Sequence, residues 1–185
     1  MFNFLFKFLF KLAGWKLVGE FPKHIKKSIL IVAPHAQSVD FPVGIGARAA
    51  IGVKMSFLGK KELFEGPFGW MFRWLGGYPV DRSSNNQVVK AVTTLYNSKE
   101  ELHLVIAPEG TRKDVDKLKM GFYFIAKNSE IPIIMIGFDY SIKGIVISEP
   151  FYTSTDSHAD LKQIALFFDK IGGYKKTWVS NYLKY

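Results

Sequence analysis

The chain alternates apolar blocks with segments of helical spacing. Four apolar runs, bounded by turn residues, predict buried strands; they are Ser28–Ala33, Val53–Leu58, Leu102–Ala107 and Ile131–Tyr140. Two shorter stretches, Tyr78–Val80 and Gly144–Ser148, predict further strands. Between the strands, apolar residues spaced by three and four predict helices. The first begins at Ser38 or Asp40 and ends near Ala50, and the second covers Glu62–Leu75 with an interruption at Gly66-Pro67. Three further helices are expected over Asn85–Asn97, Lys119–Lys127 and Asp156–Ile171.

Strands that alternate with helices predict an α/β fold. Because these strands are almost wholly apolar, we expect a mainly parallel central sheet that is flanked by helices on both faces. A chain of 185 residues is long enough for one core and too short for two comfortable domains. We therefore expect a membrane-interface helix over residues 1–20 and a single α/β domain over residues 21–185.

The first residues have a pattern of their own. Asn3, Lys7 and Lys11 recur every four residues and form a narrow polar stripe, while phenylalanine and leucine cover the rest of the helix. This pattern predicts a helix that lies in the membrane interface with its lysines directed to the headgroups. The alternative is a helix packed on the protein's own core or on another subunit. The residues expected at the bilayer are Phe2, Phe6, Lys7, Phe10, Lys11 and Trp15.

Composition and charge narrow the possible functions. The 48% of hydrophobic and 22% of charged residues exclude a disordered chain, and the lack of cysteine excludes a thiol nucleophile and a disulfide framework. The net charge of +9 lies at the two ends, because residues 1–27 hold six lysines and one acid and residues 161–185 hold five lysines and one acid. A neutral body with basic ends favours an anionic membrane surface over nucleic acid as the partner.

Polar clusters follow three of the predicted strands, at the edge where ligands bind in parallel sheets. His35 comes directly after the first strand, and Asp40 follows five residues later. Across a strand-to-helix turn, an aspartate that accepts from Nδ1–H leaves Nε2 free as a base. No G-x-S-x-G sequence supplies a serine nucleophile, so the hydroxyl to be deprotonated would belong to the substrate. The alternative is a structural histidine, with Asp40 as a helix cap.

The second and third clusters, at Gly77–Arg82 and Ala107–Arg112, each end in an arginine. Gly110 permits close approach of the backbone, Thr111 offers a hydroxyl and Arg112 offers a planar fork that suits phosphate. Arg82 and Lys60 are further candidate cations for an anionic ligand. The alternative for Arg82 is a structural ion pair, and the alternative for Lys60 is a solvated surface lysine. No metal site is expected, because the other histidines, His24, His103 and His158, lack ligand spacing.

Together these clusters resemble the glycerolipid acyltransferases, the bacterial 1-acylglycerol-3-phosphate (lysophosphatidate) acyltransferase group. Four blocks carry the resemblance in the family's order: the H-x4-D motif at His35–Asp40, GGYPVDR at Gly76–Arg82, APEGTR at Ala107–Arg112 and IPII at Ile131–Ile134. Ala107 departs from the family's usual aromatic residue. The resemblance implies a glycerol-3-phosphate acyltransferase-like fold and transfer of an acyl group from acyl-CoA or acyl-carrier protein, as co-substrate and without a resident cofactor, to the free hydroxyl of a lysolipid.

The resemblance also implies roles for single residues. His35 is the general base and Asp40 its orienting partner, while Lys60, Arg82, Glu109, Gly110, Thr111 and Arg112 hold the acceptor. We expect a peripheral, monotopic enzyme at the cytoplasmic face of the inner membrane, with lysophosphatidate or a related lysolipid as acceptor. The alternatives are the same chemistry on a lyso-aminolipid and a non-catalytic lipid-binding protein on the same fold.

Overall fold

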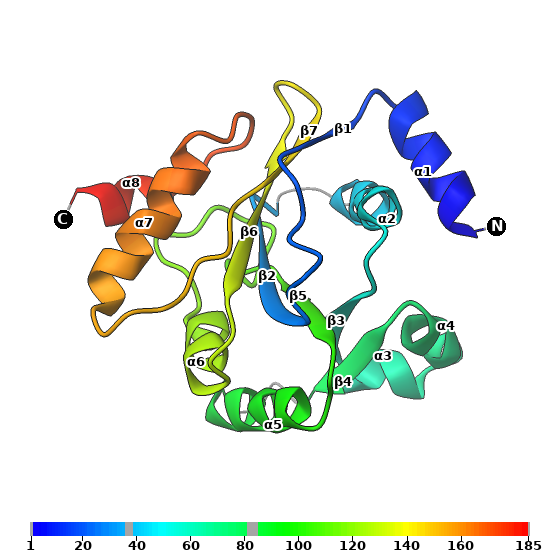
Figure 1. The fold of residues 1–185 in the computed structure, drawn as a ribbon, viewed down its shortest axis with the longest axis horizontal. Coiled ribbons are helices and arrows are strands. Elements are labelled where there is room, and N and C mark those ends of the chain that lie inside the picture. Colours follow the sequence, from blue (N-terminus) through cyan, green and yellow to red (C-terminus); the bar gives the residue numbers. More distant parts are fainter. Residues whose placement is uncertain (1, 36–38, 81–84, 185) are drawn as a thin grey trace.

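The fold is a twisted sheet between two layers of helices (Figure 1). The computed structural model describes residues 2–35, 39–80 and 85–184. Within them the sheet has seven strands in the order β1-β7-β6-β2-β5-β3-β4, whose bounds are β1 (Lys16–Val18), β2 (Lys27–Ala33), β3 (Met55–Lys60), β4 (Gly77–Val80), β5 (Leu102–Ile106), β6 (Ile133–Asp139) and β7 (Gly144–Ile147). All neighbouring strands are parallel except β6 and β7, which form an antiparallel pair. The expected mainly parallel α/β sheet is confirmed.

The two sheet faces carry separate helix layers. On one face, α1 (Phe2–Leu12) packs on α2 (Asp40–Ile51), and the core below them includes Leu30 and Ile134. The other face carries the larger core with Ile29 and Ile133, and it is covered by α5 (Asn85–Asn97), α6 (Gly121–Asn128), α7 (Ser157–Asp169) and α8 (Thr177–Leu183). Side chains of successive strand residues alternate between the faces, so apolar runs without polar interruption supply both cores.

Some elements differ from the expectation. The predicted helix over Glu62–Leu75 is two short helices, α3 (Lys61–Glu65) and α4 (Gly69–Trp74), because Pro67 restricts the residue before it to extended backbone and Gly66 adopts that conformation. Strand β1 and helix α8 were not predicted. Both are short, and α8 depends on tertiary contacts of Trp178, which is 1% exposed in the core.

The N-terminal helix is amphipathic as expected, but two of its expected bilayer residues face inward. Phe10 is buried against Gly46 of α2, where the absence of a side chain makes room for the ring. Trp15 is buried edge-on against Phe138 and Tyr140. Both side chains therefore belong to the protein's own core and not to an exposed face.

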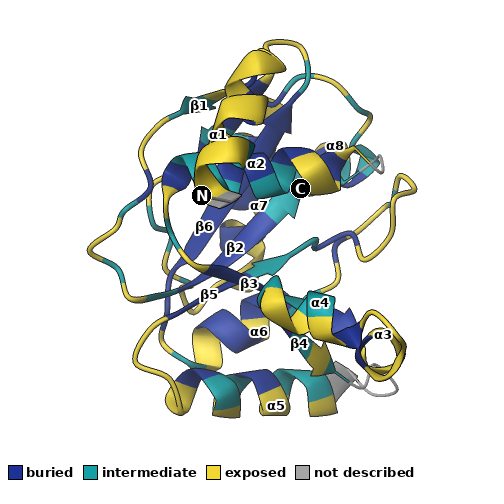
Figure 2. Cartoon of the chain, turned by 90° about the vertical axis from the view of Figure 1, so that its right-hand side faces the viewer, coloured by how far each residue is buried: buried dark blue, intermediate teal, exposed yellow. Residues whose placement is uncertain are grey.

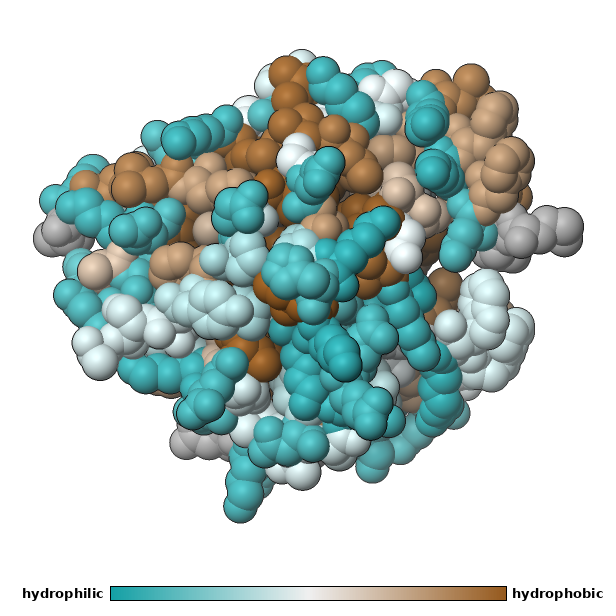
Figure 3. Space-filling view, in the orientation of Figure 1, coloured by the Kyte–Doolittle hydropathy of each residue, from teal (hydrophilic) through white to brown (hydrophobic). Residues whose placement is uncertain are grey.

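Most of the other described side chains of the N-terminal helix are exposed to solvent. Phe6 is half-buried, Lys7 and Lys11 are exposed, and the side chain of Phe2 lies outside the described part of the chain. The large exposed side chains of α1 are Phe4, Leu5, Phe8, Leu9 and Leu12. Figure 3 shows apolar side chains gathered over α1 with hydrophilic ones between them. Among the described residues, no helix is long and apolar enough to cross a bilayer.

Candidate active site

The site lies where three parallel strands end side by side. Strand β2 is paired with β5 and with β6, and the partners Ile31↔Ile106 and Ala33↔Gly137 fix their registers. His35 follows β2, Glu109 follows β5 and Tyr140 follows β6. The fold therefore brings together residues that lie up to about one hundred positions apart in the sequence, at the edge where open α/β sheets bind ligands.

His35 and Asp40 form the pair that their spacing predicts. Nδ1 of His35 lies 3.1 Å from Oδ2 of Asp40. The Asp40 side chain, at the start of α2, is 3% exposed, whereas that of His35 is 29% exposed and accessible to a substrate. If Nδ1–H donates to the carboxylate, Nε2 keeps its lone pair and can accept a proton. This geometry suits a general base of fixed tautomer.

A third residue, Tyr140, completes this arrangement. Its hydroxyl donates to Oδ1 of Asp40, so that the two carboxylate oxygens bind Tyr140 and His35 separately. The Tyr140 ring is held edge-on by Trp15 at 5.2 Å and by Tyr174 at 5.0 Å between ring centroids. Burial, and after it the bond to the Asp40 carboxylate, raises the pKa of Tyr140. The phenol therefore stays protonated and serves as a donor at neutral pH.

Glu109 is a buried carboxyl beside the His35 backbone. Its Oε1 accepts from the backbone N–H of His35 at 3.2 Å, and its Oε2 is buried without a hydrogen-bond partner. Burial is the main cause that raises the pKa of Glu109 to about 7; the His35 bond opposes this shift and the negative charge of Asp40 adds to it. Near neutral pH both the neutral and the charged form of this carboxyl are therefore accessible, so it can donate or accept a hydrogen bond.

The segment after β5 carries the other acceptor-binding candidates. Gly110 has φ +67, and a Cβ there would meet the side chain of Lys119, so this turn favours glycine. Thr111 and Arg112 are exposed, and the Thr111 hydroxyl accepts from the backbone N–H of Lys113 at 3.2 Å. Lys60 is the exposed last residue of β3. Arg82 lies outside the described residues.

The C-terminal segment, residues 172–177, borders this site. The Tyr174 ring contacts Tyr140, and the Thr177 hydroxyl donates to Asp114 at 2.5 Å. Burial lowers the pKa of the Lys176 ammonium, and Asp169, Asp139 and Glu109 oppose that shift. The C-terminal segment therefore places the Lys176 ammonium where it interacts electrostatically with the Glu109 carboxyl.

Sequence reasoning missed Tyr140, Tyr174 and Lys176. For Tyr140 one signal was present, since it directly follows a buried strand and thus lies at the same sheet edge as His35. Its partner Asp40 is one hundred residues earlier, and only the β2–β6 register joins the two. Tyr174 and Lys176 lie in irregular backbone before α8, where no periodicity places a side chain.

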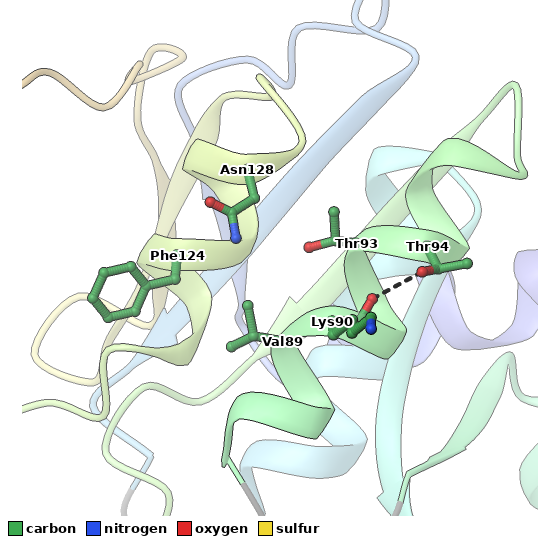
Figure 4. A pocket seen from close by; sticks show the side chains of 6 residues that line it. All are labelled: Val89, Lys90, Thr93, Thr94, Phe124 and Asn128. Carbon is green, nitrogen blue, oxygen red and sulfur yellow. Dashed lines mark hydrogen bonds between the residues drawn. The ribbon is translucent and has the colours of Figure 1, made fainter.

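A surface depression elsewhere is unrelated to this site. It lies between α5 and α6, with Phe124, Asn128 and residues of α5 around it (Figure 4). None of the residues placed at the strand ends lines it. Among the described residues, no group of three His, Asp or Glu side chains has the arrangement of a metal site.

Comparison with known proteins places the chain in a family. The family model described as Acyltransferase matches residues 16–139. The chain belongs to the acyltransferase family. The match includes the His35–Asp40 pair, Lys60 and the Glu109–Arg112 turn, and leaves out the whole of α1 and the whole C-terminal segment.

Two known acyltransferases are similar to this chain. A 1-acyl-sn-glycerol-3-phosphate acyltransferase from Streptococcus pneumoniae is 30% identical over 149 residues, which cover 78% of this chain and 54% of that protein. The chain thus spans about half the length of this curated relative. The crystal structure of the 1-acyl-sn-glycerophosphate (LPA) acyltransferase, PlsC, from Thermotoga maritima superposes with a TM-score of 0.59 at 19% identity, covering 91% of this chain and 75% of that one. At this identity the likeness shows a shared fold.

Proposed function

We propose that this acyltransferase-family chain moves a fatty acyl group from an acyl thioester to the free hydroxyl of lysophosphatidate or a related lysolipid. The observation that carries the proposal is the His35–Asp40 pair, an accessible imidazole bonded at Nδ1 to a buried carboxylate. It supplies one base and, with no cysteine in the chain, leaves the nucleophilic hydroxyl to the substrate. The lysophosphatidate-type acceptor is supported by the names of the two similar acyltransferases.

The proposed step is a direct transfer. Nε2 of His35 takes the proton of the acceptor hydroxyl while its oxygen attacks the thioester carbonyl carbon, which gives a tetrahedral intermediate. When the intermediate collapses, the C–S bond breaks, the thiolate leaves and the imidazolium returns the proton to sulfur. The products are the ester and a free thiol, and His35 is regenerated. Asp40 holds the imidazole and stabilises its positive charge.

The surrounding residues fit an anionic, hydroxyl-bearing acceptor. Arg112 and Lys60 offer positive charge for a phosphate, and we assign Arg82 to the same role. Glu109 has an unpartnered Oε2 beside His35, and an acceptor hydroxyl can provide its missing hydrogen bond. Burying an unpaired polar atom is unfavourable, so binding the acceptor there would relieve that cost.

The membrane supplies the setting of this chemistry. A lysolipid and its diacyl product reside in a bilayer, and α1 presents Phe4 and Phe8 to solvent with Lys7 and Lys11 on the same helix. We infer that α1 lies in the interface of the inner membrane at its cytoplasmic face, where the acyl thioesters are found. The helix would hold the protein as a peripheral enzyme.

The test is an acyl-transfer assay with the purified protein. It offers acyl-CoA and acyl-carrier protein separately, each against lysophosphatidate and against lyso-aminolipids. Diacyl product from lysophosphatidate supports the proposal and identifies the donor. Product from a phosphate-free acceptor alone would keep the chemistry and refute the assigned acceptor. Folded protein that gives no product with any pair, yet binds lysolipid, would refute catalysis in favour of lipid binding.

A further inference from the structure

The helices α3 and α4 expose large apolar side chains that the proposed function does not use. Phe68, Trp70 and Trp74 are 63%, 68% and 59% exposed, and we call these three residues the aromatic platform. Leu63 on α3 is exposed beside them in the sequence. Two of the four tryptophans of the chain thus lie in a surface helix of six residues. Soluble proteins seldom expose contiguous large apolar side chains without a binding role.

The platform and α1 lie on the same side of the sheet. Phe64 of α3 packs into the space that Gly59 and Gly77 leave on β3 and β4. Met55 and Gly59 are four positions apart on β3, so they face the same side of the sheet. Met55 belongs to the core on that side, which also includes Phe10 and Trp15. Leu58, on the opposite face, packs against the other core.

Helix α2 joins the two regions of this side. Nη1 of Arg48, in α2, donates to the carbonyl of Leu75 at the end of α4 with a distance of 2.7 Å. Figure 2 shows α1, α2, α4 and α3 together on the side that faces the viewer, with exposed segments on α1, α3 and α4. The platform and the exposed apolar side chains of α1 therefore lie on the same side of the molecule, with α2 in contact with both regions.

Chemistry favours a lipid surface as the occupant. Tryptophan rings, with one polar N–H on a large apolar body, are enriched where hydrocarbon meets water. Lys60, Lys61 and Arg73 are exposed in the same segment, against Glu62 and Glu65, and α1 adds Lys7 and Lys11 without an acid. This mixture of aromatic and basic side chains is typical of an interface with anionic headgroups.

We propose that the aromatic platform is a second bilayer contact, which binds anionic phospholipid membranes together with α1. The inference rests on the proposed function, because it assigns a surface to the same membrane-bound enzyme. The platform segment starts directly after Lys60, at the strand-end edge that also holds His35. A protein held by one helix can still rotate about that helix on the bilayer. Two contacts fix its orientation and bring this edge of the sheet to the lipid headgroups.

Tryptophan fluorescence tests the contact directly. Trp15 and Trp178 are 8% and 1% exposed, so brominated acyl chains in anionic vesicles can reach mainly Trp70 and Trp74. We expect wild-type emission to shift to the blue and to be quenched by these vesicles. The Trp70→Phe/Trp74→Phe variant should bind equally but lose the quenching. Bound wild-type protein whose emission is no more quenched than that of the variant would overturn the proposal.

A binding measurement separates the platform from α1. We expect Trp70→Ser to weaken partition to anionic vesicles about tenfold, and Phe124→Ser, an exposed aromatic on α6 of the other helix layer, to leave it within about twofold. Equal binding of the two folded variants refutes the platform. No binding by the wild type refutes the membrane setting itself. A wild-type dimer that Trp70→Ser turns into monomers, with binding unchanged, would assign the platform to a second copy of the chain.

Discussion

Replacing Tyr140 with phenylalanine removes one hydroxyl and keeps the ring between Trp15 and Tyr174. The hydroxyl is the donor to Oδ1 of Asp40, while Oδ2 faces Nδ1 of His35 at 3.1 Å. The change therefore leaves a buried carboxylate with one hydrogen bond fewer and does not touch His35. Any effect on catalysis must pass through Asp40, which makes Tyr140 a positioning residue.

The size of the effect follows from that lost bond. A hydrogen bond to a charged group contributes about 1.5–3 kcal/mol to stability, and we expect Tyr140→Phe to unfold more easily by that amount. If about 1.4 kcal/mol of it is lost from the transition state, kcat falls about tenfold.

A matched control separates positioning from stability. The Tyr123 hydroxyl donates to Asp160 at 2.8 Å, and this pair is also buried but lies between α6 and α7, away from His35. Tyr123→Phe should lose similar stability in urea unfolding and keep kcat and KM. If Tyr140→Phe and Tyr123→Phe have the same kcat and the same KM, Tyr140 supports the fold alone and does not position His35.

Three further predictions concern charge, acceptor and membrane. The pKa of Glu109 is about 7 in the folded protein, against an ordinary value of 4.5, so its contribution to stability is complete below about pH 4.5 and is lost as the pH rises to about 7. In urea unfolding, the free energy of unfolding of Glu109→Gln should exceed that of the wild type by up to about 3 kcal/mol at pH 8 and match it at pH 4. Equal stability of the two proteins at pH 8 would exclude the raised pKa. Arg112→Ala should raise the KM for lysophosphatidate more than it lowers kcat, and a loss in kcat alone would mean a contact made only in the transition state. Phe4→Ser/Phe8→Ser should release the protein from anionic vesicles in a sedimentation assay, whereas Tyr152→Ser, also exposed, should not, and unchanged sedimentation of the first variant would refute α1 as an anchor.

The sequence predicted the central strands because burial on both faces leaves a signal that needs no tertiary information. The runs around Ile29, Leu104 and Ile134 are apolar on consecutive positions, as a strand between two helix layers requires. The proximity of His35 and Glu109 could also be predicted, because both follow parallel strands whose carboxyl ends lie at the same edge of the sheet. Strand β7 was predicted at Gly144–Ser148, but its antiparallel direction and the three-residue β1 were not, because strand direction and order depend on contacts that no local pattern encodes.

The N-terminal helix shows where periodicity was insufficient. Its apolar residues cover most of the circumference, so the pattern did not identify which aromatics face inward. Gly46 of α2 decides this, because its missing side chain admits Phe10, and Trp15 follows the helix into the core beside Tyr140. The role of Tyr140 was hidden for the same reason, since its contact with Asp40 arises only when β6 lies beside β2.

In the proposed step His35 is the base of the acyl transfer, and the turnover rate of His35→Ala is the test of this role. Product formation from an acyl thioester and lysophosphatidate would be measured for the wild type, His35→Ala and the control His158→Ala. His158 is a suitable control because it is an exposed histidine on α7. Thermal unfolding would establish that each protein is folded. We expect His35→Ala to lose at least about 100-fold in kcat and His158→Ala to match the wild type. A folded His35→Ala enzyme within about tenfold of the wild-type rate would exclude His35 as the base.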